Sequence, residues 1–69
     1  MECLYRKLYG LLKQHKIRFS KFKKEVELTK ADLYALEYGD MLNHDTLSRI
    51  CLYFKCDLRD IMEIKNEFL

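Results

Sequence analysis

The sequence has 69 residues, of which 49% are hydrophobic and 35% are charged, and its net charge is +2. A chain of this length forms one domain, 1–69, and buries only about 60% of the surface that its unfolded form exposes, which leaves no room for a large substrate pocket. The composition is that of a globular protein and excludes a disordered one. The longest apolar run, 50–54, is far too short to span a membrane.

The numbers of glycines, prolines and cysteines indicate the fold class and the cellular compartment. The chain has no proline and two glycines, Gly10 and Gly39. A β-rich fold of this length needs several tight turns and the residues that make them, so the composition predicts an all-α fold. The three cysteines are an odd number without framework spacing, which predicts reduced thiols in a cytoplasmic protein.

Two helices are predicted in the first third of the chain. Leucines recur at helical spacing, which predicts an amphipathic helix over about 2–15. The period breaks after Lys16, and a second helix is predicted over about 19–26, with Phe22 and Val26 facing inward. Its lysines then face solvent.

A third helix is predicted over about 30–38, and the motif that contains it spans about 17–39. Thr29 can cap this helix, because its hydroxyl can accept a backbone N–H of the first turn, and Asp32 lies three residues on. Leu33 and Leu36 are expected to face inward. Gly39 can supply the left-handed residue that ends the helix.

Two more helices complete the prediction. Asn43 can cap a fourth helix, whose apolar stripe is the clearest in the sequence and contains Leu47, Ile50, Cys51 and Phe54. Asp57 can cap a short fifth helix, with Asp60 placed as in a capping box. The predicted architecture is therefore a compact all-α domain of five helices.

Charge is unevenly distributed along the chain. Residues 1–30 carry a net charge of +6 and residues 31–69 carry −4. Six basic residues fall between positions 13 and 24: Lys13, Lys16, Arg18, Lys21, Lys23 and Lys24. Such a cluster is either a solvated surface or a site for a polyanion.

The outward face of the predicted third helix favours nucleic acid. At about 100° per residue, inward leucines place Ala31, Tyr34, Ala35 and Tyr38 on the opposite side, with Lys30 near one edge. Small residues allow close approach to a groove, and a phenol or an ammonium group can reach a phosphate or a base edge. Alternatively, exposed tyrosines can bind a partner protein.

These features resemble a phage-repressor-type (Cro/CI, XRE-like) helix-turn-helix domain over nearly the full length of the chain. The resemblance rests on the leucine-striped first helix, Ile17, Phe22, the Leu28–Thr29 pair and Gly39. Its most specific part is the segment 47–62, which is similar to the final two helices of small single-domain members, with Cys51 and Cys56 included.

The resemblance implies a repressor-like transcriptional regulator that binds double-stranded DNA with the 30–38 helix in the major groove. It implies a bacterial or phage protein associated with the nucleoid. The DNA-binding residues that follow from it and from the helical face are Thr29, Lys30, Ala31, Tyr34, Ala35, Tyr38, Arg18, Phe19 and Lys21.

Three positions depart from the family pattern. Phe19 replaces a common glutamine that binds phosphate, Lys23 replaces a small alanine between the two motif helices, and Glu27 replaces the turn glycine. The methylene groups of Lys23 can cover the core while its charge reaches solvent. These departures motivate an alternative, in which the fold is a protein-interaction module or antirepressor that docks a partner through Phe19, Tyr34 and Tyr38.

No residue pattern indicates catalysis, a cofactor or a metal. Cys51, Cys56, His15 and His44 lack the spacing of a zinc site, and no third group can orient a Cys–His pair. The sequence contains no phosphate-binding glycine loop and no visible effector site. We therefore expect a non-enzyme without cofactor.

A homodimer on a two-fold-symmetric operator is expected, with its recognition helices about 34 Å apart. The chain has apolar residues with no clear place in a small core, and these are the expected dimer contacts: Phe54, Ile64, Phe68 and Leu69.

Overall fold

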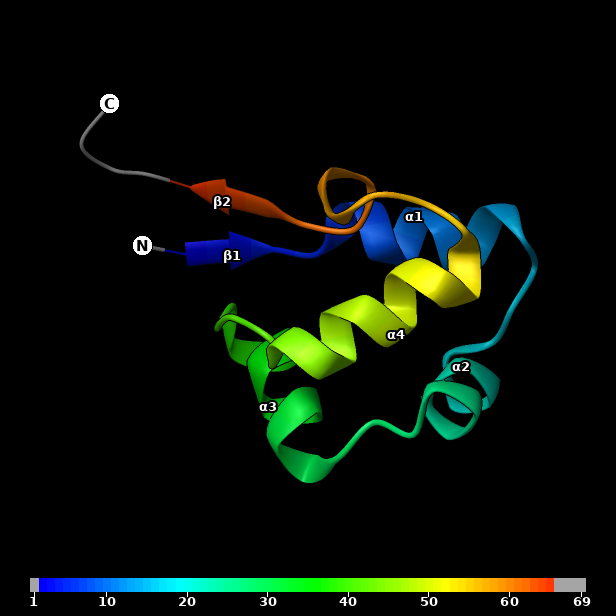
Figure 1. Cartoon of the computed structure of the whole chain (residues 1–69), viewed down its shortest axis with the longest axis horizontal. Coiled ribbons are helices and arrows are strands. Elements are labelled where there is room, and N and C mark those ends of the chain that lie inside the picture. Colours follow the sequence, from blue (N-terminus) through cyan, green and yellow to red (C-terminus); the bar gives the residue numbers. More distant parts are fainter. Residues whose placement is uncertain (1, 66–69) are drawn as a thin grey trace.

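Four α-helices and one two-stranded sheet make up residues 2–65, the part of the chain that this computed structural model describes (Figure 1). In chain order the elements are β1 (Glu2–Leu4), α1 (Arg6–Gln14), α2 (Phe19–Val26), α3 (Lys30–Tyr38), α4 (His44–Phe54), the 3-10 turn η1 (Leu58–Asp60) and β2 (Glu63–Lys65). The expected dimer residues Phe68 and Leu69 lie outside the described range.

The three central helices agree with the sequence prediction. α2 and α3 begin and end at the predicted residues. Asn43 caps α4, since its side-chain oxygen accepts the backbone N–H of Asp45 at 2.8 Å. Gly39 ends α3 with a φ of 74°, in the left-handed region that glycine adopts without strain.

The predictions for the two ends of the chain were wrong. Residues 2–4 are a strand and not the first turn of a helix, and they pair antiparallel with β2, with Cys3 opposite Ile64. The predicted fifth helix is only the three-residue turn η1. Strand pairing between segments about 60 residues apart leaves no pattern in the sequence near either segment. The spacing of the apolar residues was therefore the only signal at the two ends of the chain, and it indicated helices.

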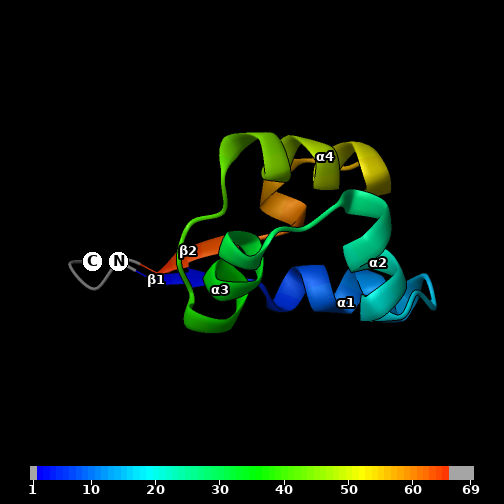
Figure 2. The same cartoon turned by 90° about the horizontal axis from the view of Figure 1, so that it is seen from below.

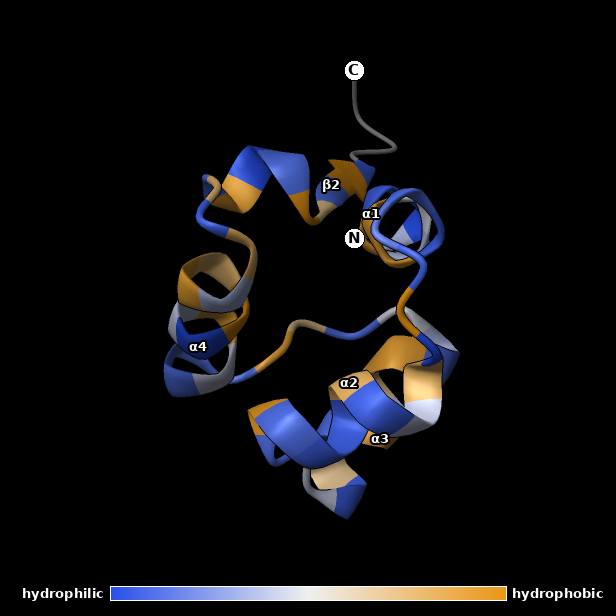
Figure 3. Cartoon of the chain, turned by 90° about the vertical axis from the view of Figure 1, so that its right-hand side faces the viewer, coloured by the Kyte–Doolittle hydropathy of each residue, from blue (hydrophilic) through white to orange (hydrophobic). Residues whose placement is uncertain are grey.

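The core lies between α4 on one side and α1 with the sheet on the other, and α2 and α3 cross below it (Figures 1 and 2). In Figure 3 this arrangement is seen end-on, with α4 and α1 on opposite sides. Leu8, Phe22, Ile50 and Ile61 are the largest fully buried side chains. They come from α1, α2, α4 and the segment after η1, so one core joins every layer.

Phe22 is at the centre of an aromatic cluster. Its ring centroid lies 6.0 Å from that of Phe19, 5.7 Å from that of Tyr53 and 5.7 Å from that of Phe54. Phe54, an expected dimer contact, is therefore half-buried against the core, and its part in a dimer stays a prediction. The expected dimer residue Ile64 lies in β2 with its side chain exposed.

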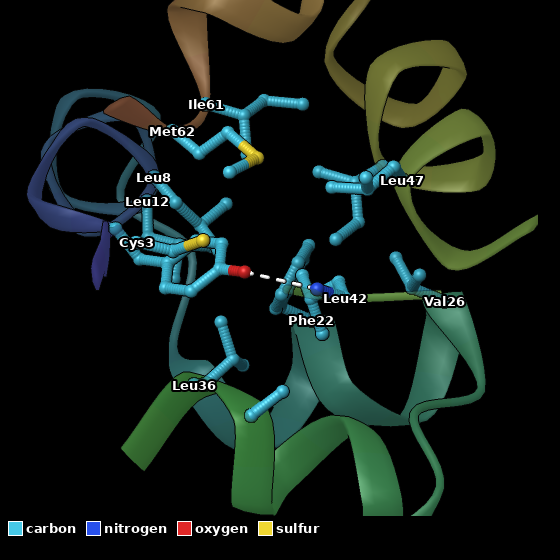
Figure 4. Close-up of a cluster of buried hydrophobic side chains, with 13 residues drawn as sticks. Cys3, Leu8, Leu12, Phe22, Val26, Leu36, Leu42, Leu47, Ile61 and Met62 are labelled. Carbon is cyan, nitrogen blue, oxygen red and sulfur yellow. Dashed lines mark hydrogen bonds between the residues drawn. The ribbon is translucent and has the colours of Figure 1, made fainter. Parts of the chain in front are cut away.

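Hydrogen bonds of Tyr5 connect the linker between α3 and α4 to the N-terminal segment. Its buried hydroxyl donates a hydrogen bond to the Asp40 carbonyl oxygen at 2.6 Å and accepts one from the Leu42 N–H at 3.1 Å (dashed line in Figure 4). The Cys3 N–H also donates to the Gly39 carbonyl oxygen at 2.8 Å. β1 and the residue that follows it therefore hold the chain as it leaves α3.

We expect Tyr5→Phe to lower the free energy of unfolding by about 1–3 kcal/mol, because the buried Leu42 N–H loses its acceptor. Burial raises the pKa of the Tyr5 phenol to about 12, above the value of about 10 in an unfolded chain. The stability that the un-ionised Tyr5 phenol contributes is complete below pH 10 and is lost as the pH rises from 10 towards 12. The reason is that the phenol loses its proton at a lower pH in the unfolded chain than in the folded one.

Urea denaturation at pH 7 and between pH 9 and pH 12 measures both effects. The control is Tyr38→Phe, because Tyr38 is exposed and its hydroxyl makes no hydrogen bond within residues 2–65. Tyr5→Phe should lose less stability than the control above pH 10. Equal stabilities of the two variants at pH 7 would contradict the assigned role of the Tyr5 hydroxyl.

Three residues other than glycine adopt left-handed backbone conformations. Lys16, Glu27 and Lys55 have φ values of 57°, 59° and 54°, and each follows the end of a helix. Glu27 occupies the position where the resemblance led us to expect a turn glycine. The left-handed conformation costs roughly 1–2 kcal/mol for a residue with a Cβ atom, so the turn is preserved at some cost in stability.

No helix within residues 2–65 has the length and apolar character needed to cross a membrane.

Candidate nucleic-acid interface

A capping box fixes the first turn of α3. The Thr29 hydroxyl oxygen accepts the Asp32 N–H at 3.2 Å, and Asp32 Oδ2 accepts the Thr29 N–H at 2.9 Å. This reciprocal pair satisfies two N–H groups that a helix start otherwise leaves without partners. The prediction that Thr29 caps the helix with Asp32 in its first turn is confirmed.

Asp32 also ties α3 to α4, which the sequence did not reveal. Its Oδ1 accepts the hydroxyl of Thr46 at 3.0 Å, and Thr46 in turn accepts a hydrogen bond from Arg49 Nη2 at 3.3 Å. Asp32 and Thr46 are the two buried polar residues of residues 3–65. A buried and fully bonded carboxylate sets the position of a helix more sharply than apolar contacts do.

The inward face of α3 differs from the predicted one. Asp32, Ala35 and Leu36 are buried, whereas Leu33 is only half-buried. Ala35 is only 6% exposed, so placing it on the outward, base-facing side was wrong. The error arose because an aspartate is not expected in a core, and Asp32 takes the inward place that the prediction gave to Leu33.

The exposed face of α3 presents Lys30, Ala31, Tyr34, Glu37 and Tyr38. Tyr34 is 58% exposed and Tyr38 is 62% exposed, yet their ring centroids lie only 4.4 Å apart. The two phenol rings therefore support each other on the surface one helical turn apart. Four of the five predicted α3 residues other than Thr29 thus share this face, and Ala35 does not.

The start of α2 exposes its charged residues more fully than its aromatic residue. Arg18 and Lys21 are exposed. Phe19 is half-buried, with its ring 6.1 Å from Tyr9 and 6.0 Å from Phe22. Phe19 therefore packs on the core, and the three-residue aromatic docking patch of the alternative hypothesis is reduced to the Tyr34–Tyr38 pair.

The basic cluster is available for an external partner. All of its residues are exposed, and none forms an ion pair within the described chain: Lys13, Lys16, Arg18, Lys21, Lys23 and Lys24. Lys30, at the start of α3, is also exposed and without an ion pair in residues 2–65. Exposed and unpaired cations on α1, on α2 and at the start of α3 are the electrostatic feature that phosphate binding requires.

A shallow cavity of about 450 Å³ opens between the starts of α3 and α4, although the length of the chain led us to expect no room for a large pocket. Its walls include the polar network described above, with Ala31 at its rim on the α3 side and Arg49 on the α4 side. This opening adjoins the exposed face of α3, so the polar network both anchors the helix and borders its presented surface.

The cysteines and histidines do not assemble a site. Burial, and after it nearby negative groups, raises the pKa of the Cys51 and Cys56 thiols. His15 lies against Phe54, with ring centroids 5.6 Å apart. No cluster of three or more His, Cys, Asp or Glu side chains able to hold a metal is found in the described range.

Comparison with known proteins assigns the family. The model of the Cro/C1-type HTH DNA-binding domain matches residues 7–67, which is most of the chain. The chain belongs to the Cro/C1-type helix-turn-helix family. In this Cro/C1-type domain, α2 and α3 are the two motif helices, and the capping box at Thr29 begins the second of them.

A solved structure supports the same assignment. This Cro/C1-type domain is similar to the transcriptional regulator VanUg in its crystal form II, with 27% sequence identity and a TM-score of 0.86. The similarity covers 96% of this chain and 88% of that chain. No curated protein sequence matches at a significant level.

Proposed function

We propose that this protein is a sequence-specific regulator of transcription that inserts α3 into the major groove of double-stranded DNA. The observation that carries the proposal is the exposed face of α3, held rigidly by the capping box and by Asp32 on Thr46, in a Cro/C1-type domain. A helix fixed at its start can place its first residues at base edges with defined register. VanUg is named a transcriptional regulator, which favours the same role here.

The roles of the charged residues follow from their positions. Exposed basic residues of the α1–α2 region would neutralise phosphates and provide affinity that decreases with salt. Lys30 and the tyrosines would provide register and specificity. Occupying the DNA would block transcription, so the protein would act as a repressor, and the proposal includes no catalytic step and no cofactor.

The proposal includes a homodimer on a two-fold-symmetric operator, because one recognition helix contacts too few base pairs to select a site on its own. Two exposed apolar side chains, Leu52 of α4 (78% exposed) and Leu58 of η1, line a second shallow cavity, which is separate from the one beside α3. This surface is a better candidate for the contact between copies than Phe54, which packs on the core.

Selection from a pool of random duplexes by the purified protein at moderate salt tests the proposal. An enriched palindrome with half-sites about one helical turn apart is the expected result. Enrichment of a single half-site would contradict the homodimer. Retention without any enriched sequence would contradict sequence-specific binding.

We expect Lys30→Glu to weaken binding to the selected duplex by about 10-fold to 100-fold, since it replaces an attraction at the start of α3 by repulsion. The matched control is Lys55→Glu, which makes the same charge change after the end of α4. Both variants are titrated by fluorescence anisotropy at one salt concentration. Equal losses for the two variants would show that the assigned face is wrong.

Exposure of the Tyr34–Tyr38 pair favours a second candidate, a protein-interaction module with little DNA affinity. Salt discriminates between the two functions. The affinity for DNA should fall steeply between 50 and 200 mM salt, by roughly 10³-fold to 10⁵-fold if six to ten phosphates are contacted. Binding of a partner protein through the aromatic rings should change little over the same range.

A further inference from the structure

The side chains on the exposed face of α3 limit which bases the helix can recognise. Paired hydrogen bonds to bases come from arginine, lysine, asparagine or glutamine, and Lys30 at the start of α3 is the one such residue in this helix. Lys30 and Glu37 are the two charged groups on the face, and they lie at its two ends. Between them, the surface offered to DNA is mostly apolar, because it consists of the Ala31 methyl group and the two tyrosine rings, with the phenol hydroxyls as its polar atoms.

That apolar surface is built from a methyl group and a supported ring. Ala31 and Tyr34 are three residues apart, so they lie side by side on the helix surface. Tyr38 packs against Tyr34 at a centroid distance of 4.4 Å and limits the rotamers that the Tyr34 ring can adopt. Ala31 is the nearer of these residues to the helix start, where base contacts concentrate in this mode of docking.

Only one base presents a matching group in the major groove. Adenine, guanine and cytosine present hydrogen-bond donors and acceptors there, whereas thymine adds an apolar C5-methyl group to its acceptor. A base donor or acceptor that lies against the Ala31 methyl group or the Tyr34 ring would lose its water and gain no hydrogen-bond partner, which weakens binding.

We infer that this protein selects a thymine in each half-site through its C5-methyl group, which packs between the Ala31 methyl group and the Tyr34 ring. Tyr38 is a positioning residue that holds the Tyr34 ring. The inference rests on the proposed function and names the base chemistry that the recognition helix prefers.

The test replaces thymine by deoxyuridine, which pairs identically and lacks only the methyl group. The duplex enriched by selection is resynthesised with one such replacement at a time, and the dissociation constant of each is measured. We expect at least one position in each half-site where the loss is about fourfold, the value for one buried methylene-sized group. Replacement in both half-sites should cost about sixteenfold.

Two variants connect the effect to the named residues. Tyr34→Ala should bring the ratio of thymine to deoxyuridine affinities at that position close to one, whereas Tyr38→Phe keeps the supporting ring and should leave the ratio unchanged. Circular dichroism is used to check that both variants are folded. Because the readout is a ratio for one protein, a general loss of affinity does not affect it.

Two results would overturn the inference, and they are distinguishable. Equal affinities for thymine and deoxyuridine at every position of a tightly bound duplex would overturn it and leave the proposed function intact. If no duplex is selected at all, both the inference and the proposed function are overturned.

Discussion

Phe22→Ala is expected to lower the free energy of unfolding by about 3–5 kcal/mol. The Phe22 side chain is fully buried, and three aromatic rings lie against it, so truncation leaves a cavity that the neighbours cannot close without moving α2 and α4. A domain of 69 residues has roughly 3–10 kcal/mol of stability. The variant therefore loses about a third of its stability or more.

Urea denaturation followed by circular dichroism at 25 °C measures the effect. Phe19→Ala is the matched control, since it makes the same change at a half-buried ring of the same cluster and should cost clearly less. A loss below about 1 kcal/mol for Phe22→Ala would mean that the core is organised around another residue.

Asp32→Ala is expected to lower the free energy of unfolding by about 2–4 kcal/mol, which is a large effect for a helix that has one face exposed to solvent. About 1 kcal/mol comes from the lost cap of α3. The remainder comes from the Thr46 hydroxyl, which stays buried after losing its acceptor. The change loosens α3 at the end where base contacts are proposed.

A double-mutant cycle with Thr46→Val isolates the buried hydrogen bond. We expect a coupling energy between 0.5 and 3 kcal/mol, because the two side chains share one bond. Asp45→Ala serves as the control, since Asp45 is also acidic and in a first helical turn but is exposed, and its removal should cost less than about 1 kcal/mol. Additive effects of the Asp32 and Thr46 changes would refute the proposed anchor.

Local signals in the sequence were sufficient for α2, α3 and α4. Capping residues such as Thr29 and Asn43 form their hydrogen bonds with backbone N–H groups two or three residues further along the chain. The apolar stripe of α4 has a regular helical period. Gly39 was identified as a helix end for the same reason, since its left-handed conformation is a property of one residue. These features could be predicted because the interactions that create them are short in sequence.

Features that depend on distant partners could not be predicted. The pairing of Cys3 with Ile64 and the bonds from Tyr5 to Asp40 and Leu42 join segments between 35 and 61 residues apart. The burial of Asp32 depends on Thr46, fourteen residues away. The sequence therefore identified the candidate helix and most of its exposed face but missed the contacts that hold it in place.

Most of the predicted site residues lie on or beside one surface, although their contact with DNA stays a prediction. Ala35 was misplaced because a sequence cannot show that a carboxylate is satisfied in the interior. Phe19 was assigned from the family position of a glutamine, and its ring instead joins the aromatic core.

The β1–β2 pair gives the domain an order of assembly. Joining residues 2–4 to residues 63–65 closes a loop of about 60 residues, which costs about 2 kcal/mol more chain entropy than closing a five-residue turn. The helices can form from local contacts, so the strands join late in folding and separate early when the protein opens. Because the chain around β1 also holds Gly39, Asp40 and Leu42, fraying of the strands loosens the far end of α3.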